Sequence, residues 1–516
     1  MTDVLIAGGG PNGLLMACEL ALAGVRPIVL EHLAERPVMP KANGLVGRVV
    51  QALDYRGLYE LFSGSTTAPV AVPAFQFGAL PLDLSTLDGH ALYAQPIPQR
   101  RMEELLEKRA HELGVEIRRG HRLTGLSQDD DLVTVDVEGP DGDYRLTAQY
   151  LVGADGGHST VRKTCGIGFP GVTEQGFVTR TAQVSVDASA VVAGTGELEV
   201  AGVGRFRPTT FTRTETGMFV FGMFQPGLYR VAVFESVPPG SEPDDSEPLS
   251  LDELREAVRR VVGGELPMSE PVGGEPVALR RTTGANSRQA DRYREGRVFL
   301  VGDAAHVHSG VGGSGLNLGM QDVLNLGWKL AAAVHGRAPV GLLDTYQAER
   351  LPVGRRVIMH TRAQTALLAP GANVTALREL FGELLRESDN VRHIADLMAG
   401  ADIRYDMRTA SKHPLVGGWM PDLALRKGNR VAEVLRPGRP VLLDLAGRAD
   451  LADVARGWVD VARGWVDVVS DSVEGEAPAE AVLVRPDGYV AWAAGPEGTA
   501  DELRGALRTW FGASGS

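Results

Sequence analysis

Cysteine, lysine and net positive charge are all scarce in this chain of 516 residues. Its two cysteines, Cys18 and Cys165, allow at most one disulfide, which excludes a disulfide-stapled secreted scaffold and a four-cysteine zinc site. Only six of the 52 basic residues are lysine, and the formal net charge is −13. A chain this acidic lacks the electrostatic footprint of a non-specific nucleic-acid binder, so we expect no nucleic-acid partner.

Long apolar runs are missing as well. The longest conspicuous uncharged stretch, residues 61–82, contains three prolines and is a poor membrane-spanning helix. The first strand-like run, residues 4–7, begins so early that no signal peptide fits before it. We therefore expect a cytoplasmic protein of two or three domains, without a membrane partner, that is a monomer or a dimer.

Glycine, in contrast, is abundant at 64 residues, and part of it forms a motif near the N-terminus. Gly8, Gly10 and Gly13 match G-x-G-x-x-G within a strand, turn, helix and strand over residues 3–30. Glu31 follows Gly13 by 18 residues, close to the spacing of the ribose-binding acid in dinucleotide-binding folds. Since the helix N-terminus attracts phosphates and the glycines let the backbone approach them, the sequence predicts a dinucleotide site.

Two later motifs place an aspartate beside a glycine at the end of a strand. Asp155 ends an alternating strand pair, and Asp303 ends a buried strand. A glycine-dense loop, residues 310–315, then leads into a helix, residues 316–330. Either aspartate alone could be a turn residue or a helix cap, but all three motifs together favour a bound nucleotide.

These three motifs, in this order, resemble the class A flavoprotein monooxygenases, the group that includes p-hydroxybenzoate hydroxylase. The similarity is closest to aromatic polyketide hydroxylases, which share the Gly-Trp-Lys-Leu run at 327–330. The resemblance covers essentially the whole chain and implies an α/β fold. Its expected parts are a Rossmann-like FAD-binding domain, a substrate-binding β-sheet domain and a thioredoxin-like C-terminal domain without a CxxC motif. Their expected bounds are 1–170 with 281–400, then 171–280, then 401–516.

The resemblance also implies bound FAD and transiently docked NADPH. By it, Asp303 hydrogen-bonds the ribityl chain or ribose, Asp155 serves both FAD and NADPH, and Gln99 contacts the flavin. Lys41 stands where relatives have an arginine near the FAD phosphates, which keeps the charge but loses the bidentate fork. The helix that opens after the loop offers N–H donors and a positive dipole end to the flavin N1–C2=O edge. The expected cofactor-binding residues are Gly8, Gly10, Gly13, Glu31, Lys41, Gln99, Asp155, Asp303, Gly315, Leu316 and Asn317, and no metal site is expected.

The implied reaction is NADPH- and O₂-dependent hydroxylation of a polycyclic aromatic substrate through a C4a-hydroperoxyflavin. The expected catalytic residues are Gly310, Gly312 and Gly313, which leave space above the flavin, and His308, which could face the pocket; a structural role is expected for His306. Relatives usually have proline at position 310, and glycine there is expected to relax the loop.

That departure leaves other reactions open on the same scaffold. These are Baeyer–Villiger insertion, epoxidation and another oxidative rearrangement of an aromatic polyketide. A flavin-binding partner without oxygenase activity, acting in a biosynthetic complex, is the alternative from a different class.

Two further segments carry structural expectations. Phe219, Phe221 and Met223 alternate along one predicted strand, which makes them either the core of a sheet or an apolar wall over the substrate. Residues 454–460 are repeated at once as 461–467, and we expect this duplication to lengthen one helix.

Overall fold

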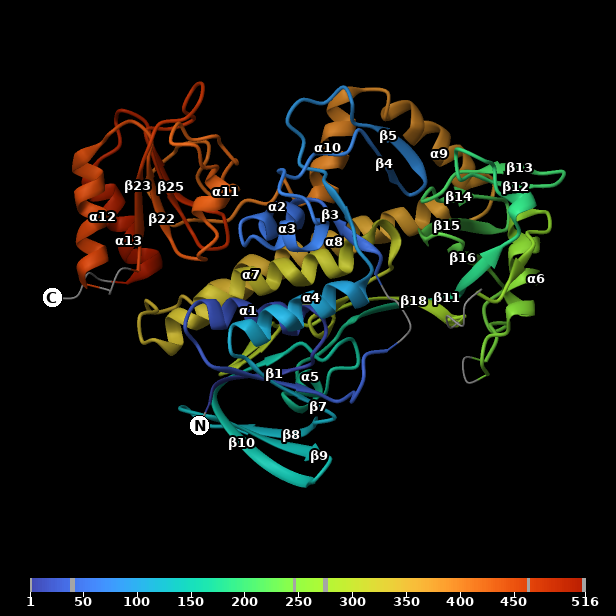
Figure 1. Ribbon diagram of the computed structural model, residues 1–516, viewed down its shortest axis with the longest axis horizontal. Coiled ribbons are helices and arrows are strands. Elements are labelled where there is room, and N and C mark those ends of the chain that lie inside the picture. Colours follow the sequence, from blue (N-terminus) through green and yellow to red (C-terminus); the bar gives the residue numbers. More distant parts are fainter. Residues whose placement is uncertain (1, 38–41, 245–246, 272–276, 462–464, 513–516) are drawn as a thin grey trace.

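The computed structural model describes residues 2–37, 42–244, 247–271, 277–461 and 465–512. Lys41 lies outside these described residues. Figure 1 shows a central body with one sheet below the long helices, a second sheet to one side and the C-terminal domain to the other.

The first sheet has eight strands in the order β19-β20-β10-β1-β2-β7, extended by β9 and β8 from the edge of β10. The strands β20, β10, β1, β2 and β7 run parallel, as a nucleotide-binding fold requires. The strands are β1 (Thr2–Ala7), β2 (Pro27–Glu31), β7 (Glu116–Arg119), β8 (Arg122–Gln128), β9 (Val133–Gly139), β10 (Gly142–Gly153), β19 (Arg294–Glu295) and β20 (Val298–Leu300).

Helix α1 packs against both α4 and α7 over this sheet (Figure 1). Val4 and Ile6 of β1 are fully buried beneath them, since a parallel strand covered on both faces has no solvent side. The helices of this region are α1 (Pro11–Leu22), α2 (Arg48–Asp54), α3 (Leu58–Ser63), α4 (Gln99–Glu112), α5 (Thr160–Thr164) and α7 (Ser314–Val334).

The second sheet has seven strands in the order β14-β15-β16-β11-β18-β21, with β17 beside β11. Strand β18 crosses the boundary expected at residue 280, and β21 joins this sheet directly after the Asp303 turn. Helix α6 (Leu251–Val262) covers one face of it. The strands are β11 (Gly171–Val186), β14 (Thr212–Arg213), β15 (Gly217–Gln225), β16 (Leu228–Ser236), β17 (Met268–Ser269), β18 (Arg280–Gln289) and β21 (His306–Val307).

The alternating aromatic residues of β15 face α6. Phe219 and Phe221 are buried in a cluster with Leu254 and Val258 of that helix, whereas Met223 is 54% exposed. Phe219 and Phe221 are therefore core residues of the sheet. The opposite face of β15 presents Met218 toward the glycine-rich loop.

Three more helices and three small strand pairs complete the central body. Helices α9 and α10 lie with the hairpin of β4 and β5 along one edge (Figure 1). The remaining elements are α8 (Asp344–Leu368), α9 (Ala372–Leu384), α10 (Ser388–Ala399), β3 (Gly44–Val46), β4 (Ala74–Phe77), β5 (Leu80–Asp83), β6 (Ala94–Pro96), β12 (Leu198–Val200) and β13 (Gly204–Phe206).

The C-terminal domain is a four-stranded mixed sheet in the order β23-β22-β24-β25. Both cysteines lie outside it, so it has no thiol chemistry. Its core contains Trp492 and Trp510, each buried to 1% exposure or less. Its elements are α11 (Val431–Val434), α12 (Ala449–Val461), α13 (Ala500–Phe511), β22 (Val441–Asp444), β23 (Asp467–Ser470), β24 (Ala481–Val484) and β25 (Val490–Ala494).

The tandem repeat does not extend a single helix to its end. Helix α12 ends at Val461, residues 462–464 lie outside the described part, and Asp467 begins β23. Trp465 and Val466 are buried and not helical. The expectation of one longer helix is wrong here because Asp467 pairs in parallel with β22, which holds the end of the second copy in the sheet.

Candidate active site

The first glycine-rich turn is packed tightly where the protein needs it and open where a ligand would lie. Gly8 has φ +107°, and a Cβ added to it would lie 2.4 Å from the carbonyl oxygen of Ala154. A Cβ on Gly13 would lie 1.9 Å from the carbonyl oxygen of Gly8. A Cβ on Gly10 would meet no atom within 4 Å. Gly8 and Gly13 thus close the turn, and Gly10 leaves the backbone accessible to a phosphate.

Glu31 lies at the end of β2, beside this turn, and is buried. Its Oε2 accepts a hydrogen bond of 2.6 Å from the N–H of Gly9, and its Oε1 accepts one of 2.8 Å from the N–H of Leu33. The Oε1 also lies 3.0 Å from Nδ1 of His32, so it is Oε2 that keeps a further lone pair to accept from a ribose hydroxyl. Glu31 therefore both shapes the turn and fits the ribose role.

Asp155 and Asn12 each hold an unsatisfied oxygen near the nucleotide turn. Asp155 Oδ2 accepts from the N–H of Val161 at 3.1 Å, whereas its Oδ1 is buried without a partner in the part of the chain described. The Asn12 Oδ1 is orphaned in the same way. Burial raises the pKa of the Asp155 carboxyl, against the lowering effect of its hydrogen bonds. Buried acceptors of this kind call for donors from a ligand.

The second aspartate has the opposite environment. Asp303 lies in a short 3-10 helix (Gly302–Ala304) directly after β20, with an exposed side chain that has no bonding partner among the described residues. Gly302 before it has φ +60°, and a Cβ there would lie 2.1 Å from Nδ2 of Asn12. The backbone is thus fixed against α1 while the carboxylate stays free to accept hydroxyl hydrogen bonds.

Helix α7 begins directly after the glycine-rich loop. Its N-cap residue is Gly313, which has φ +69° and no side chain to cap the helix. The first-turn N–H groups, from Ser314 through Leu316, therefore remain available to an anionic or carbonyl oxygen. Asn317 is nearly buried, and its side chain is used within the protein. Its Oδ1 accepts from the N–H of Val46 at 3.1 Å, and its Nδ2 donates to the carbonyl of Gly313 at 2.8 Å.

Gln99 holds the chain that leads to β3. Its Oε1 accepts from the N–H of Ala42 at 3.2 Å, and its Nε2 donates to Glu103 Oε1 at 2.7 Å. The side chain is therefore satisfied within the protein, and it orders the backbone beside residue 41.

The loop before α7 has the shape that a proline would give it. Gly310 has φ −70° and ψ 1°, within the range that proline imposes, and a Cβ there would meet no atom within 4 Å. The expectation that glycine relaxes this loop is therefore not supported by its backbone. Gly312, in contrast, has φ +77° and would place a Cβ 3.0 Å from Nε2 of Gln364.

His308 lies against the start of α7. Its Nδ1 is 3.0 Å from the carbonyl oxygen of Ser309, and its Nε2 is buried without a hydrogen-bond partner among the described residues. A Cβ added to Gly315 would lie 3.7 Å from that Nε2. Burial, helped by the nearby imidazoles of His306 and His360, lowers the pKa of His308 to about 4. At neutral pH it is an uncharged hydrogen-bond acceptor.

An apolar cluster lies on the other side of the loop. Met218 of β15, Val311 of the loop and Leu368 of α8 are buried together, with Phe211 and Phe234 packed against them. The sheet face opposite α6 therefore contacts the loop, and Phe211 and Phe234 pack against that contact.

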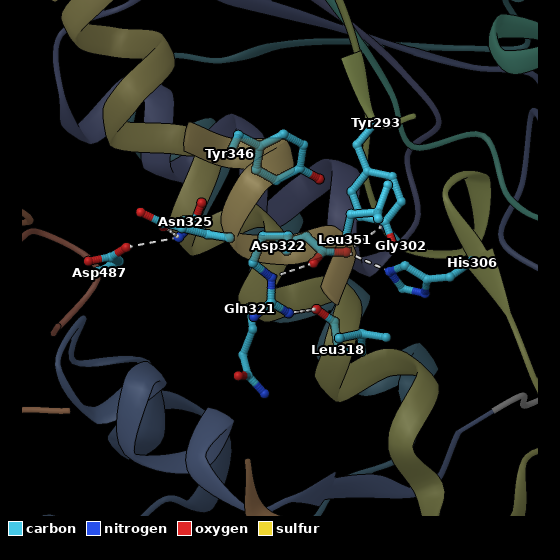
Figure 2. Close-up of polar contacts among 12 residues, drawn as sticks. Tyr293, Gly302, His306, Leu318, Gln321, Asp322, Asn325, Tyr346, Leu351 and Asp487 are labelled. Carbon is cyan, nitrogen blue, oxygen red and sulfur yellow. Dashed lines mark hydrogen bonds and ion pairs between the residues drawn. The ribbon is translucent and has the colours of Figure 1, made fainter. Parts of the chain in front are cut away.

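Sequence reasoning missed a buried polar group behind the loop (Figure 2). Asp322 of α7 is fully buried and bonds His306 Nε2 at 2.6 Å and Arg350 Nε at 2.7 Å. Asn325, one turn later, bonds Asp487 of the C-terminal domain at 3.2 Å. A polar residue inside a run of apolar helix residues was the only available signal.

The described part of the chain contains neither a helix that could span a membrane nor a cluster of metal-binding side chains. None of its helices combines the length and apolar character that crossing a bilayer requires. Its side chains form no group of three or more His, Cys, Asp or Glu residues that could hold a metal ion.

The fold and site define a nucleotide-binding flavoprotein with a second sheet over the cofactor loop. The open Gly10 turn, the orphaned Asp155 and Asn12 oxygens, the exposed Asp303 carboxylate and the uncapped α7 fit FAD as a ligand.

Comparisons with known proteins agree with this class. A family model described as FAD binding domain matches residues 1–361, and one described as aromatic-ring hydroxylase, C-terminal, matches residues 413–514. The 12-dehydrotetracycline 5-monooxygenase/anhydrotetracycline 6-monooxygenase of Streptomyces rimosus is 44% identical and aligns over 99% of each chain. The dialkyldecalin synthase of Streptomyces rugosporus is 38% identical over 99% of each chain. The solved structure of OxyS anhydrotetracycline hydroxylase from Streptomyces rimosus has a TM-score of 0.85 at 41% identity, covering 100% of both chains.

The chain belongs to the FAD-binding family of aromatic-ring hydroxylases, and it is an FAD-dependent monooxygenase. The α/β fold that the resemblance implied, with a Rossmann-like FAD-binding domain, a β-sheet domain and a thioredoxin-like C-terminal domain, is confirmed, and the C-terminal domain matches the aromatic-ring hydroxylase model.

Proposed function

We propose that this protein hydroxylates a polycyclic aromatic substrate of the polyketide type, using NADPH and O₂ and passing through a C4a-hydroperoxyflavin. The balanced reaction converts Ar–H, O₂, NADPH and H⁺ into Ar–OH, NADP⁺ and water. The observation that carries the proposal is the surroundings of the loop at 310–313. The uncapped N-terminus of α7 and the Met218 cluster border this loop, and the exposed Asp303 carboxylate precedes it in the chain.

This geometry supports the FAD-binding roles proposed for the individual residues. Gly10 and the N-terminus of α1 hold the pyrophosphate, Glu31 holds a ribose, and Asp303 accepts from the ribityl chain. The first turn of α7 donates N–H groups to the flavin N1–C2=O edge, where negative charge builds during reduction. When bound, FAD supplies the redox and oxygen chemistry.

The loop and the sheet position the substrate. Gly312 and Gly313 have positive φ and no Cβ, so no side chain of theirs projects from the loop into the space proposed for the flavin and substrate. Phe211 and Phe234, which are only partly buried, would offer an apolar wall to a flat ring system, while the buried Met218 supports the loop from the sheet side. His308, neutral at physiological pH, can accept a hydrogen bond from a phenol hydroxyl and hold the ring electron-rich.

A polycyclic aromatic substrate is supported by the names of a relative and of a solved structure, both from Streptomyces rimosus. The proteins that match at 44% and 41% identity are named for action on anhydrotetracycline, and they align along the entire chain. Anhydrotetracycline is therefore the first compound to test as a probe of the substrate pocket.

The test uses purified holoprotein with NADPH and air, with and without anhydrotetracycline. We expect the aromatic probe to accelerate flavin reduction and NADPH oxidation, and the product to gain one ¹⁸O atom from ¹⁸O₂. If neither anhydrotetracycline nor a panel of related polycyclic phenols accelerates flavin reduction, the proposed hydroxylation is wrong.

Two alternative reactions give different outcomes in the same experiment. Baeyer–Villiger insertion would also incorporate one ¹⁸O atom, but NMR would locate it in a lactone or ester. A flavin-binding partner without oxygenase activity, acting in a biosynthetic complex, would show neither faster NADPH consumption nor ¹⁸O incorporation with any of these probes.

A further inference from the structure

Asp322 is the centre of a buried polar relay behind the flavin loop. Its Oδ2 bonds His306 Nε2 at 2.6 Å and accepts from the N–H of Gly302 at 3.3 Å. Its Oδ1 accepts from Arg350 Nε at 2.7 Å. Burial alone would raise the pKa of Asp322, but Arg350 and His306 outweigh it and lower the pKa, so the carboxylate is charged. Figure 2 shows Gly302 and His306 on the same side of Asp322, with the bond from Asp322 to His306 drawn as a dashed line.

The partners of Asp322 are the residues that carry the flavin site. Gly302 directly precedes Asp303, and His306 begins β21, which leads through His308 into the glycine-rich loop. Asp322 itself lies two turns from the N-terminus of α7. One buried carboxylate thus ties together the aspartate turn, the strand into the loop and the helix whose first turn faces the flavin.

The relay continues into the C-terminal domain. Arg350 of α8 is 1% exposed and donates to the hydroxyl of Tyr405 at 3.0 Å and to the carbonyl of Leu318 at 3.1 Å. Tyr405 is buried in the same apolar cluster as Trp492 and Trp510 of the C-terminal domain. Its ring also packs on Tyr489, with ring centroids 4.3 Å apart.

A second branch fixes the next turn of α7. Asn325 Nδ2 donates to Glu349 Oε2 at 2.6 Å and to Asp487 Oδ2 at 3.2 Å. Lys329 Nζ donates to the same Glu349 oxygen at 2.8 Å, and burial lowers the pKa of Lys329 to about 8. The C-terminal domain therefore holds α7 from behind at two successive turns.

We propose that Asp322 is a positioning residue for the flavin site, and that the Tyr405–Arg350–Asp322 relay makes the C-terminal domain part of that site. The inference rests on the proposed roles of Asp303 and of the α7 N-terminus in holding FAD. It assigns the C-terminal domain a function in cofactor retention and flavin electronics, in addition to packing.

The physical reason is that a buried polar group constrains its partners only when all its bonds are made. Asparagine at 322 keeps the shape of the side chain but replaces one acceptor oxygen with an N–H₂ group. If the amide oxygen of this asparagine faces Arg350, its N–H₂ group faces the N–H of Gly302. Two donors then face each other without an acceptor, so the turn before Asp303 would shift. Tyr405→Phe removes only the hydroxyl that accepts the hydrogen bond from Arg350, at the far end of the relay.

The test compares Asp322→Asn and Tyr405→Phe with a matched control, Tyr55→Phe. Tyr55 is also buried at the interface with the C-terminal domain, where its hydroxyl donates to the carbonyl of Met420 at 2.6 Å and accepts from Trp419 Nε1 at 3.2 Å. It lies outside the relay. Three quantities are measured on purified holoprotein: the FAD dissociation constant, the flavin reduction potential and the global melting temperature.

We expect Asp322→Asn to weaken FAD binding at least tenfold and Tyr405→Phe about threefold, each with a shifted flavin potential. Tyr55→Phe should keep FAD affinity within about twofold of wild type, with a loss of melting temperature similar to that of Tyr405→Phe. Equal FAD affinity and potential in Tyr405→Phe and Tyr55→Phe would overturn the proposal. If Asp322→Asn does not fold, the pair of tyrosine variants decides alone.

A parallel variant separates this inference from the proposed function. If Asp303→Ala binds FAD as wild type does, the assigned flavin site is wrong. If Asp303→Ala loses FAD while Asp322→Asn and Tyr405→Phe keep it with an unchanged potential, the site stands and only the positioning role is wrong.

Discussion

At the scale of single residues, two aspartates in similar sequence contexts have opposite environments. Asp155 is largely buried and keeps an orphaned oxygen, whereas Asp303 is exposed beside a tightly packed Gly302. The sequence predicted that both residues end strands, because a strand followed by a glycine turn is a local pattern. It could not predict which carboxylate is accessible, since that depends on Asn12 and α1, far away in the chain.

Replacing Asp303 with alanine should weaken FAD binding. A hydrogen bond to a charged group contributes about 1.5–3 kcal/mol, so we expect a loss of affinity of about 10- to 100-fold. The measurement is FAD retention by flavin fluorescence on dilution of the holoprotein. Asp143→Ala, at an exposed position of β10, is the control and should retain FAD. Wild-type affinity in Asp303→Ala would contradict the assignment.

His308 should make stability depend on pH. Its folded pKa of about 4 lies below the ordinary value of 6.5, so between these two pH values the unfolded chain binds a proton that the folded chain does not. The free energy of unfolding should therefore be fully developed above about pH 6.5 and fall as the pH drops toward 4.

The measurement is urea unfolding of wild type and His308→Asn across this range. The variant should show a shallower dependence, by about one proton near pH 5. His360, whose pKa burial also lowers to about 4, should retain its part of the slope. His111→Asn, on the exposed face of α4, is the control for the effect of an asparagine substitution as such. An identical slope in wild type and His308→Asn would contradict the buried neutral state of His308.

At the scale of elements, periodicity predicted where strands lie but not which neighbouring element each strand face packs against. The alternation of Phe219 and Phe221 correctly places them on one face of β15. It did not reveal that this face packs against α6. Alternation along a strand shows which residues share a face, but not which distant helix covers that face. The other face of β15, with Met218, packs against Val311 of the loop.

The loop before α7 should accept proline at position 310. Its φ of −70° already suits proline, so Gly310→Pro should retain FAD and gain up to about 1 kcal/mol of stability by restricting the unfolded chain. Gly312→Ala is the matched variant. At φ +77°, with Gln364 Nε2 3.0 Å from the new Cβ, it should lose stability and weaken FAD binding. Thermal unfolding and flavin release measure both effects, and loss of FAD in Gly310→Pro would show that the loop needs glycine there.

At the scale of the whole molecule, the sequence predicted the sheet domains and the added C-terminal domain, but not how the latter docks. Docking depends on pairs such as Arg485 with Glu349, which are separated by 136 residues. Arg485 is fully buried, as is Lys329, and both share Glu349 with Asn325. A buried cation and its distant carboxylate carry no local pattern, and the Gly-Trp-Lys-Leu run at 327–330 supported the family resemblance without predicting this interface.

Breaking this docking at Arg485 should destabilise the molecule as a unit. Arg485 donates to Glu349 Oε1 at 2.7 Å and to Asp487 Oδ1 at 3.0 Å, and its guanidinium lies 4.4 Å from the ring centre of Trp510. Arg485→Met leaves both carboxylates with one buried cation, Lys329, near them. Removing one partner of a buried ion pair costs about 3–5 kcal/mol, so we expect a single cooperative unfolding transition at a clearly lower temperature.

Arg504→Met is the control for this change, since Arg504 of α13 pairs with the exposed Asp501 and should contribute less than about 1 kcal/mol. Calorimetry with flavin fluorescence checks the result. If the C-terminal domain merely sits beside the FAD-binding domain, Arg485→Met would unfold in two separate transitions, with FAD released only at the wild-type temperature. Flavin release that moves down together with the single transition would instead show that docking of the C-terminal domain and retention of FAD are one cooperative event.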